Sequence, residues 1–442
     1  MTAKWIDRHT HIAGLIESAI DAVDPYLAVK KHIYLAGDTL TVGERVLQLT
    51  PNARVFVVGA GKAGAAMALA AEEVVGARLA GGVVSVDQLP HRSPRTIKII
   101  RGGHPIPNRN SVLASRQMQT MLREGRAEDI VLAVISGGGS ALLELPVRSL
   151  RLQDLQRTTE ALLWSGAAIQ EVNVVRKELS QTKGGGLARM AAPATVVGLI
   201  LSDVVGDSLE AIASGPTVPK HTSEVDALAV VRRYGLSGTL PRRVVEYLSH
   251  QANGLSAGPQ PANERVHNVL IGNNAIACVA ASRKARRLGF HSRVLTSSFT
   301  GEAREVGGAI AALAMSPDGM KLGLRKPACL ILGGESTVTV RGRGKGGRNQ
   351  ELALAASIAL SGAKNTLVLS LATDGVDGTT PAAGAYVTGQ TLTDFKAAAL
   401  DPVRALANND SHTLLDALGQ TICTGPTGTN VGDIVFVLNY DR

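Results

Sequence analysis

The chain has 442 residues, more than one ordinary hydrophobic core accommodates, so we expect two domains. Hydrophobic residues make up 45% of the chain, aromatic residues only 3%, and 48 residues are glycine, a composition that favours an α/β enzyme over a β-sandwich. The formal net charge is +9, but no basic run is interleaved with aromatic residues, so nucleic-acid binding is not expected.

Neither the N-terminus nor the cysteines indicate export or membrane insertion. Residues 1–19 have the spacing of an amphipathic helix and lack the regions of a secretory signal. No apolar stretch reaches membrane-spanning length. Cys278, Cys329 and Cys423 lie far apart and outside any C-x-x-C motif, as is usual for reduced thiols. We therefore expect a cytoplasmic protein with no membrane partner.

Strand-like and helix-like segments alternate along the first half of the chain. The strand-like runs are residues 55–58, 82–86, 98–100, 130–135 and 195–201, and the helical ones are residues 65–75, 111–124, 152–164 and 169–177. This alternation predicts a doubly wound, largely parallel sheet, whose ligands bind beyond the carboxyl ends of the strands.

A linker and a second α/β domain follow. Residues 251–264 are rich in Gly, Pro, Asn, Ser and Ala and show no periodicity, which is typical of a linker. The alternation then resumes, with strands at 266–271, 292–296, 328–332, 336–340 and 366–371, and helices at 275–288, 302–315 and 349–361. We predict one domain over residues 1–250 and a second over residues 260–442.

The loop after the first buried strand carries the most informative motif. Gly59, Gly61 and Gly64 fit G-x-G-x-x-G between a strand and a helix, which is the context of a dinucleotide fingerprint. Lys62 lies inside this motif. An ammonium group at a helix N-terminus suits a reacting phosphoryl group at least as well as a static pyrophosphate. The loop is therefore expected to bind phosphate, either of a cofactor or of a reacting nucleotide.

A triple glycine follows the strand at residues 130–135. Gly137, Gly138 and Gly139 allow consecutive backbone N–H groups to converge on an anion, with Ser136 and Ser140 as additional donors. A tight turn between a strand and a helix is the alternative interpretation.

Two further segments of the first half carry charged or polar candidates. Asn173 and Arg176 fall on adjacent faces of a helix, and Lys183 opens another glycine loop, so these residues either bind substrate or phosphate or form a solvated basic face. Asp203 and Asp207 follow a strand, where carboxylates hold Mg²⁺ or cap helices.

The second half adds acids and a cationic loop. Glu335 closes a strand and could contact a sugar or a metal. Residues 341–348 hold glycines, three arginines and a lysine directly before a helix that includes Asn349, which favours phosphate binding. Asp374 and Asp377 share a Gly-bracketed turn that suits a general base or a metal ligand, although Asp-Gly is also ordinary turn chemistry.

The candidate loops together have the parts that phosphoryl transfer requires. That reaction needs positioning, cations for the developing charge, a divalent metal and a carboxylate that orients the accepting hydroxyl group. No Walker A motif or H-E-x-x-H motif is present. Two domains that meet at a cleft would also exclude water during the transfer.

These motifs closely resemble those of the glycerate 2-kinases of the MOFRL type, some of which have been named hydroxypyruvate reductases. The resemblance covers nearly the whole chain. Its motifs are Val57-Val-Gly-Ala-Gly-Lys-Ala, Gly102-Gly-His-Pro-Ile-Pro-Asn, Ile135-Ser-Gly-Gly-Gly-Ser-Ala-Leu, Val172-Asn-Val-Val-Arg-Lys-Glu-Leu-Ser, Leu201-Ser-Asp-Val-Val-Gly-Asp, Ile212-Ala-Ser-Gly-Pro-Thr, Gly346-Gly-Arg-Asn-Gln-Glu, Thr373-Asp-Gly-Val-Asp-Gly and Thr424-Gly-Pro-Thr-Gly-Thr-Asn.

The resemblance implies ATP-dependent phosphorylation of D-glycerate to 2-phosphoglycerate, with ATP as co-substrate and Mg²⁺ as cofactor. It also implies a Rossmann-like N-terminal domain, a smaller C-terminal α/β domain and an active site in the interdomain cleft. By motif match it assigns catalysis to Lys62, Arg348 and Asp374. The chain departs from the family after Asp377, where residues 380–382 replace the usual acid.

Two other functions are weighed against the kinase. An NAD(P)H-dependent hydroxypyruvate reductase would use the glycine fingerprint, with Asp87 at the end of the next strand as a ribose-binding acid or a mere turn residue. Lys62 inside the fingerprint and the anion loops of the second half count against it. A non-catalytic sugar-phosphate binding module is the third option. The oligomeric state is open, with a homodimer as one option.

Overall fold

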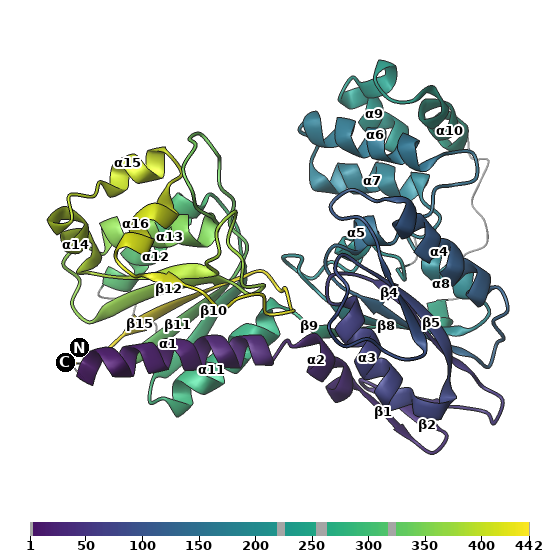
Figure 1. The fold of residues 1–442 in the computed structure, drawn as a ribbon, viewed down its shortest axis with the longest axis horizontal. Helices are drawn as coiled ribbons and strands as arrows, with labels where there is room; N and C mark the ends of the chain where they lie inside the picture. Colours follow the sequence, from purple (N-terminus) through teal and green to yellow (C-terminus); the bar gives the residue numbers. More distant parts are fainter. Residues whose placement is uncertain (1–2, 219–225, 253–262, 317–323, 442) are drawn as a thin grey trace. The chain divides into compact units, whose positions relative to one another are not determined.

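The computed structural model describes residues 3–218, 226–252, 263–316 and 324–441 (Figure 1). It contains two compact units. We call Pro25–Ile271 the parallel-sheet unit, and Met1–Asp24 together with Gly272–Arg442 the mixed-sheet unit. The predicted α/β class with two domains is confirmed. The predicted linker at residues 251–264 lies mostly outside the described residues.

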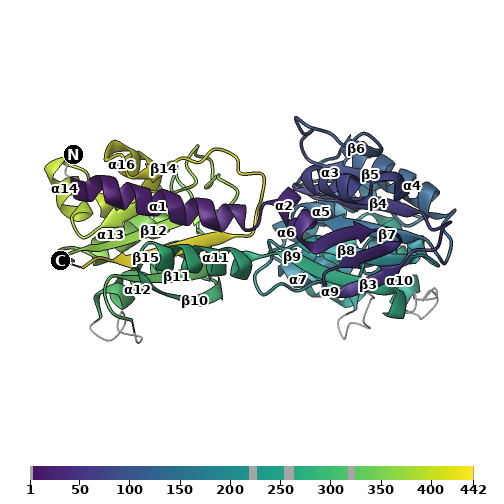
Figure 2. The same cartoon turned by 90° about the horizontal axis from the view of Figure 1, so that it is seen from below.

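The N-terminal helix α1 (Ala3–Asp21) departs from the predicted boundaries. The expected domain at residues 1–250 would include it, but it packs on α11 (Asn274–Arg287) of the mixed-sheet unit (Figure 2). Ile12, Leu15 and Ile16 of α1 are buried, so the apolar face of this helix is covered within that unit.

The central sheet of the parallel-sheet unit has the Rossmann strand order. Its strands are β4 (Val55–Ala60), β5 (Leu79–Val86), β6 (Ile97–Arg101), β7 (Ile130–Ile135), β8 (Thr195–Leu201) and β9 (Val266–Gly272). They are arranged as β6-β5-β4-β7-β8-β9, and the pairs from β6 to β8 are parallel. In chain order this is 3-2-1-4-5-6, so the order reverses between β4 and β7, where such folds bind their ligands.

Helices on both faces bury this sheet, which is why every residue of β4 and β7 is buried. The helices that contact its strands are α3 (Gly64–Val75), α4 (Arg109–Leu122), the short α5 (Gly139–Leu142) and α8 (Gly186–Ala191). A second apolar cluster lies under α6 (Leu152–Trp164), α7 (Ile169–Leu179), α9 (Ala227–Arg233) and α10 (Arg242–Ala252), which are grouped together in Figure 1. The predicted bounds of β7, β8 and α6 are confirmed.

Short elements that the sequence did not predict precede β4. They are α2 (Pro25–His32) and an antiparallel sheet of β1 (Ile33–Ala36), β2 (Thr39–Val42) and β3 (Arg45–Gln48). Each of these strands has four residues. Runs of that length are too short for a clear alternating pattern.

The mixed-sheet unit has a six-stranded sheet of order β10-β11-β15-β12-β13-β14. Its strands are β10 (His291–Phe299), β11 (Ala328–Gly334), β12 (Thr366–Ala372), β13 (Gly384–Thr388), β14 (Thr421–Ile422) and β15 (Asp433–Asn439). Only β10 and β11 are parallel to each other, and the other pairs are antiparallel. Besides α11, its helices are α12 (Ala303–Met315), α13 (Arg348–Ala359), α14 (Thr391–Ala397), α15 (Pro402–Ala407) and α16 (Ser411–Ala417).

The predicted strand at residues 336–340 is wrong. The segment makes a single bridge, between Thr337 and Glu302, and forms no strand. The carboxylate of Glu302 accepts hydrogen bonds from the backbone N–H and the hydroxyl group of Thr339. The backbone N–H of Thr339 is therefore not available to pair with a neighbouring strand. Among the helices that the structure describes, none is long and apolar enough to cross a membrane.

Candidate active site

The glycine fingerprint lies at the carboxyl end of β4, next to that of β7. The backbone of Gly59 and Gly61 has φ values of 151° and 146°. A Cβ atom at Gly59 would lie 1.9 Å from the carbonyl oxygen of Val134, and one at Gly61 would lie 2.0 Å from Oγ of Ser136. Both glycines are therefore required by contacts with β7 and the loop after it. In a dinucleotide fingerprint the second glycine instead admits a pyrophosphate, so here the need for these two glycines is explained by packing alone.

Backbone hydrogen bonds join the loops after β4 and β7. The N–H of Lys62 donates to the carbonyl oxygen of Gly137 at 2.9 Å, and that of Ala63 donates to Oγ of Ser136 at 3.1 Å. The side chain of Lys62 is exposed, and among the described residues no carboxylate forms an ion pair with it. The loop thus holds a fixed backbone and an ammonium group that is free to meet an anion.

Asp203 and His104 flank Lys62 over the glycine loop. A Cβ atom at Gly137 would lie 2.1 Å from Oδ2 of Asp203, and one at Gly138 would lie 3.1 Å from Cδ2 of His104 and 3.4 Å from Cγ of Lys62. Burial raises the pKa of Asp203, and the charge of Lys62 opposes this rise. Partial burial of the ring and the same ammonium group lower the pKa of His104, although the residue as a whole is exposed. A lysine, a carboxylate and an imidazole therefore meet at the point where the strand order reverses.

His104 was not among the predicted site residues. It lies in the loop after β6, within the segment Gly102-Gly-His-Pro-Ile-Pro-Asn. The position of this segment just past a parallel strand was the available signal, because ligands of such sheets bind at the carboxyl ends of the strands.

Ser140, Asn173 and Arg176 are brought together with Ser214, which was not predicted. Oγ of Ser140 lies 2.9 Å from Oγ of Ser214, and Ser214 donates to Oδ1 of Asn173 at 3.2 Å. Nη2 of Arg176 donates to the carbonyl oxygen of Ser140 at 3.0 Å, while its Nε is buried with no hydrogen-bond partner among the described residues. Burial lowers the pKa of Arg176. A buried donor without a partner in a polar cluster indicates that a bound ligand supplies the hydrogen-bond acceptor.

Backbone strain accompanies this cluster. Ala213 and Ser214 have φ values of 51° and 61°, in the left-handed region that residues other than glycine seldom adopt. A Cβ atom at Gly139 would lie 2.6 Å from that of Ala213, so the triple glycine packs directly on the strained segment. Strain of this kind is concentrated at functional sites.

Lys183 is buried and does not face a ligand. Its side chain is 0% exposed, and Nζ donates to Oε2 of Glu144 at 2.6 Å and to the carbonyl oxygen of Leu143 at 3.1 Å. Burial lowers the pKa of Lys183 to about 8, against the attraction of Glu144. This position argues against the predicted contact with phosphate. The lysine instead fixes the segment that follows the triple glycine.

Arg348 begins α13 in the mixed-sheet unit and is held by two carboxylates. Nε and Nη2 donate to the two oxygens of Asp433 at 2.6 and 2.9 Å, and Nη1 lies 2.8 Å from Oε1 of Glu335. Burial lowers the pKa of Arg348, but Asp433 outweighs it, so the pKa is raised. The predicted residues Arg348 and Glu335 are therefore brought together.

The carboxylate of Asp377 caps the start of α13, and Asn349 is buried in the first turn of that helix. Oδ1 of Asp377 accepts from the N–H of Asn349 at 3.0 Å and from its Nδ2 at 3.3 Å. Oδ2 accepts from the N–H and Nε2 of Gln350, both at 2.9 Å. Asn349 is itself 0% exposed. These contacts argue against the predicted metal role of Asp377 and the predicted ligand role of Asn349, because helix capping already uses the carboxylate.

The departure from the family pattern after Asp377 has a structural role as well. Oγ1 of Thr380 accepts from Nε2 of Gln350 at 2.9 Å and donates to the carbonyl oxygen of Asp377 at the same distance. Asp374, by contrast, is only partly buried, and its Oδ1 accepts one bond, from the N–H of Val376 at 3.0 Å. Of the two predicted acids in this turn, Asp374 is the one that can meet a ligand.

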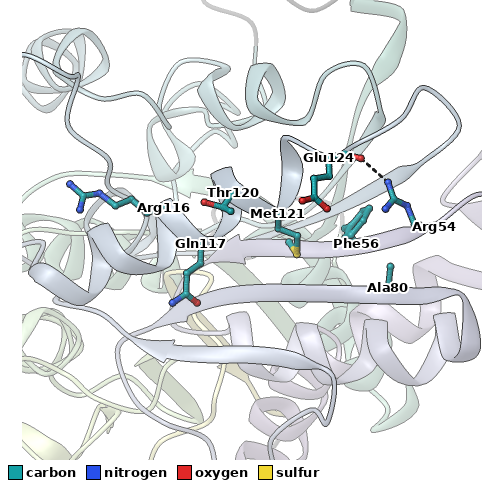
Figure 3. A pocket seen from close by; sticks show the side chains of 8 residues that line it. All are labelled: Arg54, Phe56, Ala80, Arg116, Gln117, Thr120, Met121 and Glu124. Atoms are coloured by element: carbon teal, nitrogen blue, oxygen red, sulfur yellow. Dashed lines mark hydrogen bonds between the residues drawn. The ribbon is translucent and has the colours of Figure 1, made fainter.

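A cavity of about 670 Å³ lies near the amino ends of β4 and β5, away from the loops at their carboxyl ends (Figure 3). It is lined by residues of β4, β5 and α4 and by two residues just outside these elements: Arg54, Phe56, Ala80, Arg116, Gln117, Thr120, Met121 and Glu124. Arg54 is tied to the carbonyl oxygen of Glu124 at 2.8 Å, as the dashed line shows. The cavity contains none of the predicted site residues.

Comparison with known proteins identifies the family. Residues 328–433 match the MOFRL family, and residues 11–249 match a family described as a domain of unknown function, DUF4147. The D-glycerate 2-kinase of Thermotoga maritima is 41% identical over 427 residues, which are 96% of each chain. The chain belongs to the MOFRL-type glycerate 2-kinase family.

Two further relatives extend the comparison. A crystal structure of glycerate kinase from Thermotoga maritima superimposes with a TM-score of 0.87 at 39% identity. The alignment covers 99% of the present chain and 100% of the Thermotoga chain. A protein of Agrobacterium vitis is 39% identical over 441 residues, 99% of this chain and 96% of its own, and carries a provisional name as a hydroxypyruvate reductase.

Proposed function

We propose that the protein transfers the γ-phosphoryl group of ATP to the C2 hydroxyl group of D-glycerate and releases ADP and 2-phosphoglycerate. The observation that carries this proposal is the exposed ammonium group of Lys62, which lies beside Asp203 and His104. The loop that holds Lys62 is fixed by the close packing of its glycines on β7 and on the loop after β7. A free cation on a rigid phosphate loop stabilises charge that develops during the transfer. The names of the glycerate kinase relatives agree with this reaction.

The cluster around Arg176 is the proposed site for the carboxylate of D-glycerate. Its buried Nε lacks a partner among the described residues, and Asn173, Ser140 and Ser214 supply polar atoms around it. Guanidinium groups bind carboxylates through paired N–H donors. Gly139 packs against Ala213, so the triple-glycine loop after β7 lies next to this cluster.

ATP reacts as a complex with a divalent cation, and we propose Mg²⁺. Among the residues that the structure describes, no three acidic, histidine or cysteine side chains form a metal cage. A kinase does not need one, because one or two carboxylates, substrate phosphates and water hold the ion. Asp203 fits this role, since no ion pair with a described residue occupies its carboxylate, and Asp207 follows in the same loop. When bound, the ion offsets the charge of the phosphates.

Arg348 and Asp374 are the proposed catalytic residues of the mixed-sheet unit. The contacts of Arg348 use Nε and one hydrogen on each of Nη1 and Nη2, so two N–H groups are left to bind an anion. Asp374 is partly exposed in the turn that Asp377 anchors. Asp433 and Glu335 would act by orienting Arg348.

A cytoplasmic location and a homodimer are also proposed. All three cysteines are free thiols, as is usual in a reducing compartment. Light scattering of the purified chain would measure the oligomeric state.

ADP release in the presence of ATP, Mg²⁺ and D-glycerate tests the proposed reaction. We expect turnover only when all three are present. No turnover with D-glycerate, together with NADH oxidation in the presence of hydroxypyruvate, would instead support the reductase.

A further inference from the structure

We infer that His104 is a further catalytic residue of this site and that its imidazole accepts the proton of the D-glycerate hydroxyl group as that oxygen attacks the γ-phosphorus of ATP. The inference rests on the proposed kinase reaction. In this step the bond from the hydroxyl oxygen to phosphorus forms and the bond from phosphorus to the β,γ-bridging oxygen breaks. The electron pair of the broken bond leaves with ADP, and the proton moves to a ring nitrogen.

The loop that carries His104 is held firmly at the carboxyl end of β6. The N–H of Gly102 donates to the carbonyl oxygen of Val86 at 2.8 Å, and that of Gly103 donates to Oγ of Ser111 at 3.0 Å. A Cβ atom at Gly103 would lie 2.4 Å from the carbonyl oxygen of Ile106, so the turn is closely packed. A base on such a loop keeps its position without the cost of ordering it during the reaction.

The ring of His104 is directed at the loop that is proposed to bind phosphate. A Cβ atom at Gly138 would lie 3.1 Å from Cδ2 and 3.3 Å from Nε2 of the ring, and 3.4 Å from Cγ of Lys62. Nε2 of His104 and the aliphatic part of the Lys62 side chain therefore lie on the same side of Gly138. A hydroxyl group poised to attack a phosphoryl group near Lys62 would lie within reach of this edge.

Neither ring nitrogen of His104 hydrogen-bonds to a described residue, and the residue is exposed. The charged groups that influence the ring are Lys62, which lowers its pKa together with burial, and Asp87, which raises it. Asp203 lies over the adjacent Gly137. With the pKa below its ordinary value, the imidazole is neutral at pH 7 and able to accept a proton.

Asp203 is less suited to accept the proton. A carboxylate that coordinates Mg²⁺ has its charge offset by the ion and is a weaker base. Mg²⁺ prefers oxygen ligands to the imidazole nitrogens of His104, and the exposed position of the residue lets the acquired proton pass to solvent.

The test compares His104→Gln and His104→Ala with wild type in steady-state assays of D-glycerate phosphorylation between pH 5 and 9. General-base catalysis contributes about 10²–10⁴-fold, so kcat of both variants should fall by about that factor while KM values for ATP and D-glycerate change little. The fall of wild-type kcat at acid pH should disappear in His104→Gln, and added imidazole should raise kcat of His104→Ala. His91→Gln, at an exposed histidine of the same unit, should match wild type.

Either of two results would overturn the inference. One is a kcat of His104→Gln within threefold of wild type. The other is a lower kcat that still falls at acid pH in His104→Gln and is not raised by imidazole in His104→Ala. A merely structural role of His104 would produce that pattern. Circular dichroism of both variants identifies any loss of folding, and His104→Gln keeps the size and polarity of the ring edge if the alanine variant unfolds. Failure of the proposed function would look different, because wild type itself would not phosphorylate D-glycerate.

Discussion

Replacing Asp377 by alanine should destabilise the mixed-sheet unit without weakening the affinity for Mg²⁺. The carboxylate satisfies the backbone N–H groups of Asn349 and Gln350 at 3.0 and 2.9 Å, and it is 1% exposed. A buried N–H group that loses its acceptor costs about 1–3 kcal/mol, so two of them predict a loss of about 3 kcal/mol. The buried side-chain amides of Asn349 and Gln350 lose partners as well.

The magnitude can be read from thermal unfolding. For a unit of this size, 1 kcal/mol corresponds to roughly 2–4 °C in Tm, so Asp377→Ala should lower the Tm of the mixed-sheet unit by about 6–12 °C. Asp377→Asn keeps one acceptor oxygen and should lose about half as much. Asp374→Asn is the matched control, because only one exposed hydrogen bond, to the N–H of Val376, is affected. Its Tm should stay within about 2 °C of wild type.

A metal-binding role of Asp377 predicts the opposite pattern. In that case Asp377→Asn would leave Tm near the wild-type value and raise the Mg²⁺ concentration needed for half-maximal turnover. This outcome would refute the assignment of Asp377 to helix capping and restore it as a metal ligand.

Three other predictions follow from the environments of single residues. Lys62→Ala should lower kcat by about 10³, since a cation on a transferring phosphoryl group contributes at least that factor; the exposed Lys98→Ala on β6 should not, and retention of a tenth of the activity by Lys62→Ala would refute the role. The pKa of Lys183 is about 8 in the folded state and 10.5 ordinarily, so the unfolded chain binds more protons between these values. The free energy of unfolding of wild type should therefore rise with pH relative to Lys183→Met across this window, measured by urea titration at pH 7.5 and 10; an equal slope for both proteins would contradict the burial of this lysine. A thiol reagent should label Cys423 alone in the folded protein, because Cys278 and Cys329 are buried and their pKa values are raised to about 12; mass spectrometry that finds early label on either would contradict this.

The parallel sheet was the most predictable part of the fold. Its strands are buried on both faces and read as continuous apolar runs, so β7 and β8 could be bounded to the residue. The segment at 336–340 has the same β-branched character but forms no ladder, because Glu302 binds the donors of Thr339. Local pattern cannot reveal a competing partner 37 residues away.

The site residues that directly follow a strand were predictable from the sequence. Those whose role depends on whether the side chain is buried were less predictable. Lys62 and Asp203 lie where the loops at the carboxyl ends of β4 and β8 place them. Lys183 also lies in a glycine loop, but its side chain is buried because it pairs with the carboxylate of Glu144, 39 residues earlier. Asp377 looks like a ligand in sequence, but the N-terminus of α13 packs against it. His104 and Ser214 lay in quoted motifs whose geometry only the fold supplies.

One measurement, phosphorus and proton NMR of two parallel incubations, tests most directly whether the glycine loop at β4 serves phosphoryl transfer or a nicotinamide cofactor. Purified protein would receive ATP, Mg²⁺ and D-glycerate in one sample, and NADH with hydroxypyruvate in another. A glycerate 2-kinase should convert the first sample to ADP and 2-phosphoglycerate and leave NADH in the second unchanged. Oxidation of NADH in the second sample without any phosphoglycerate in the first would contradict the proposed function.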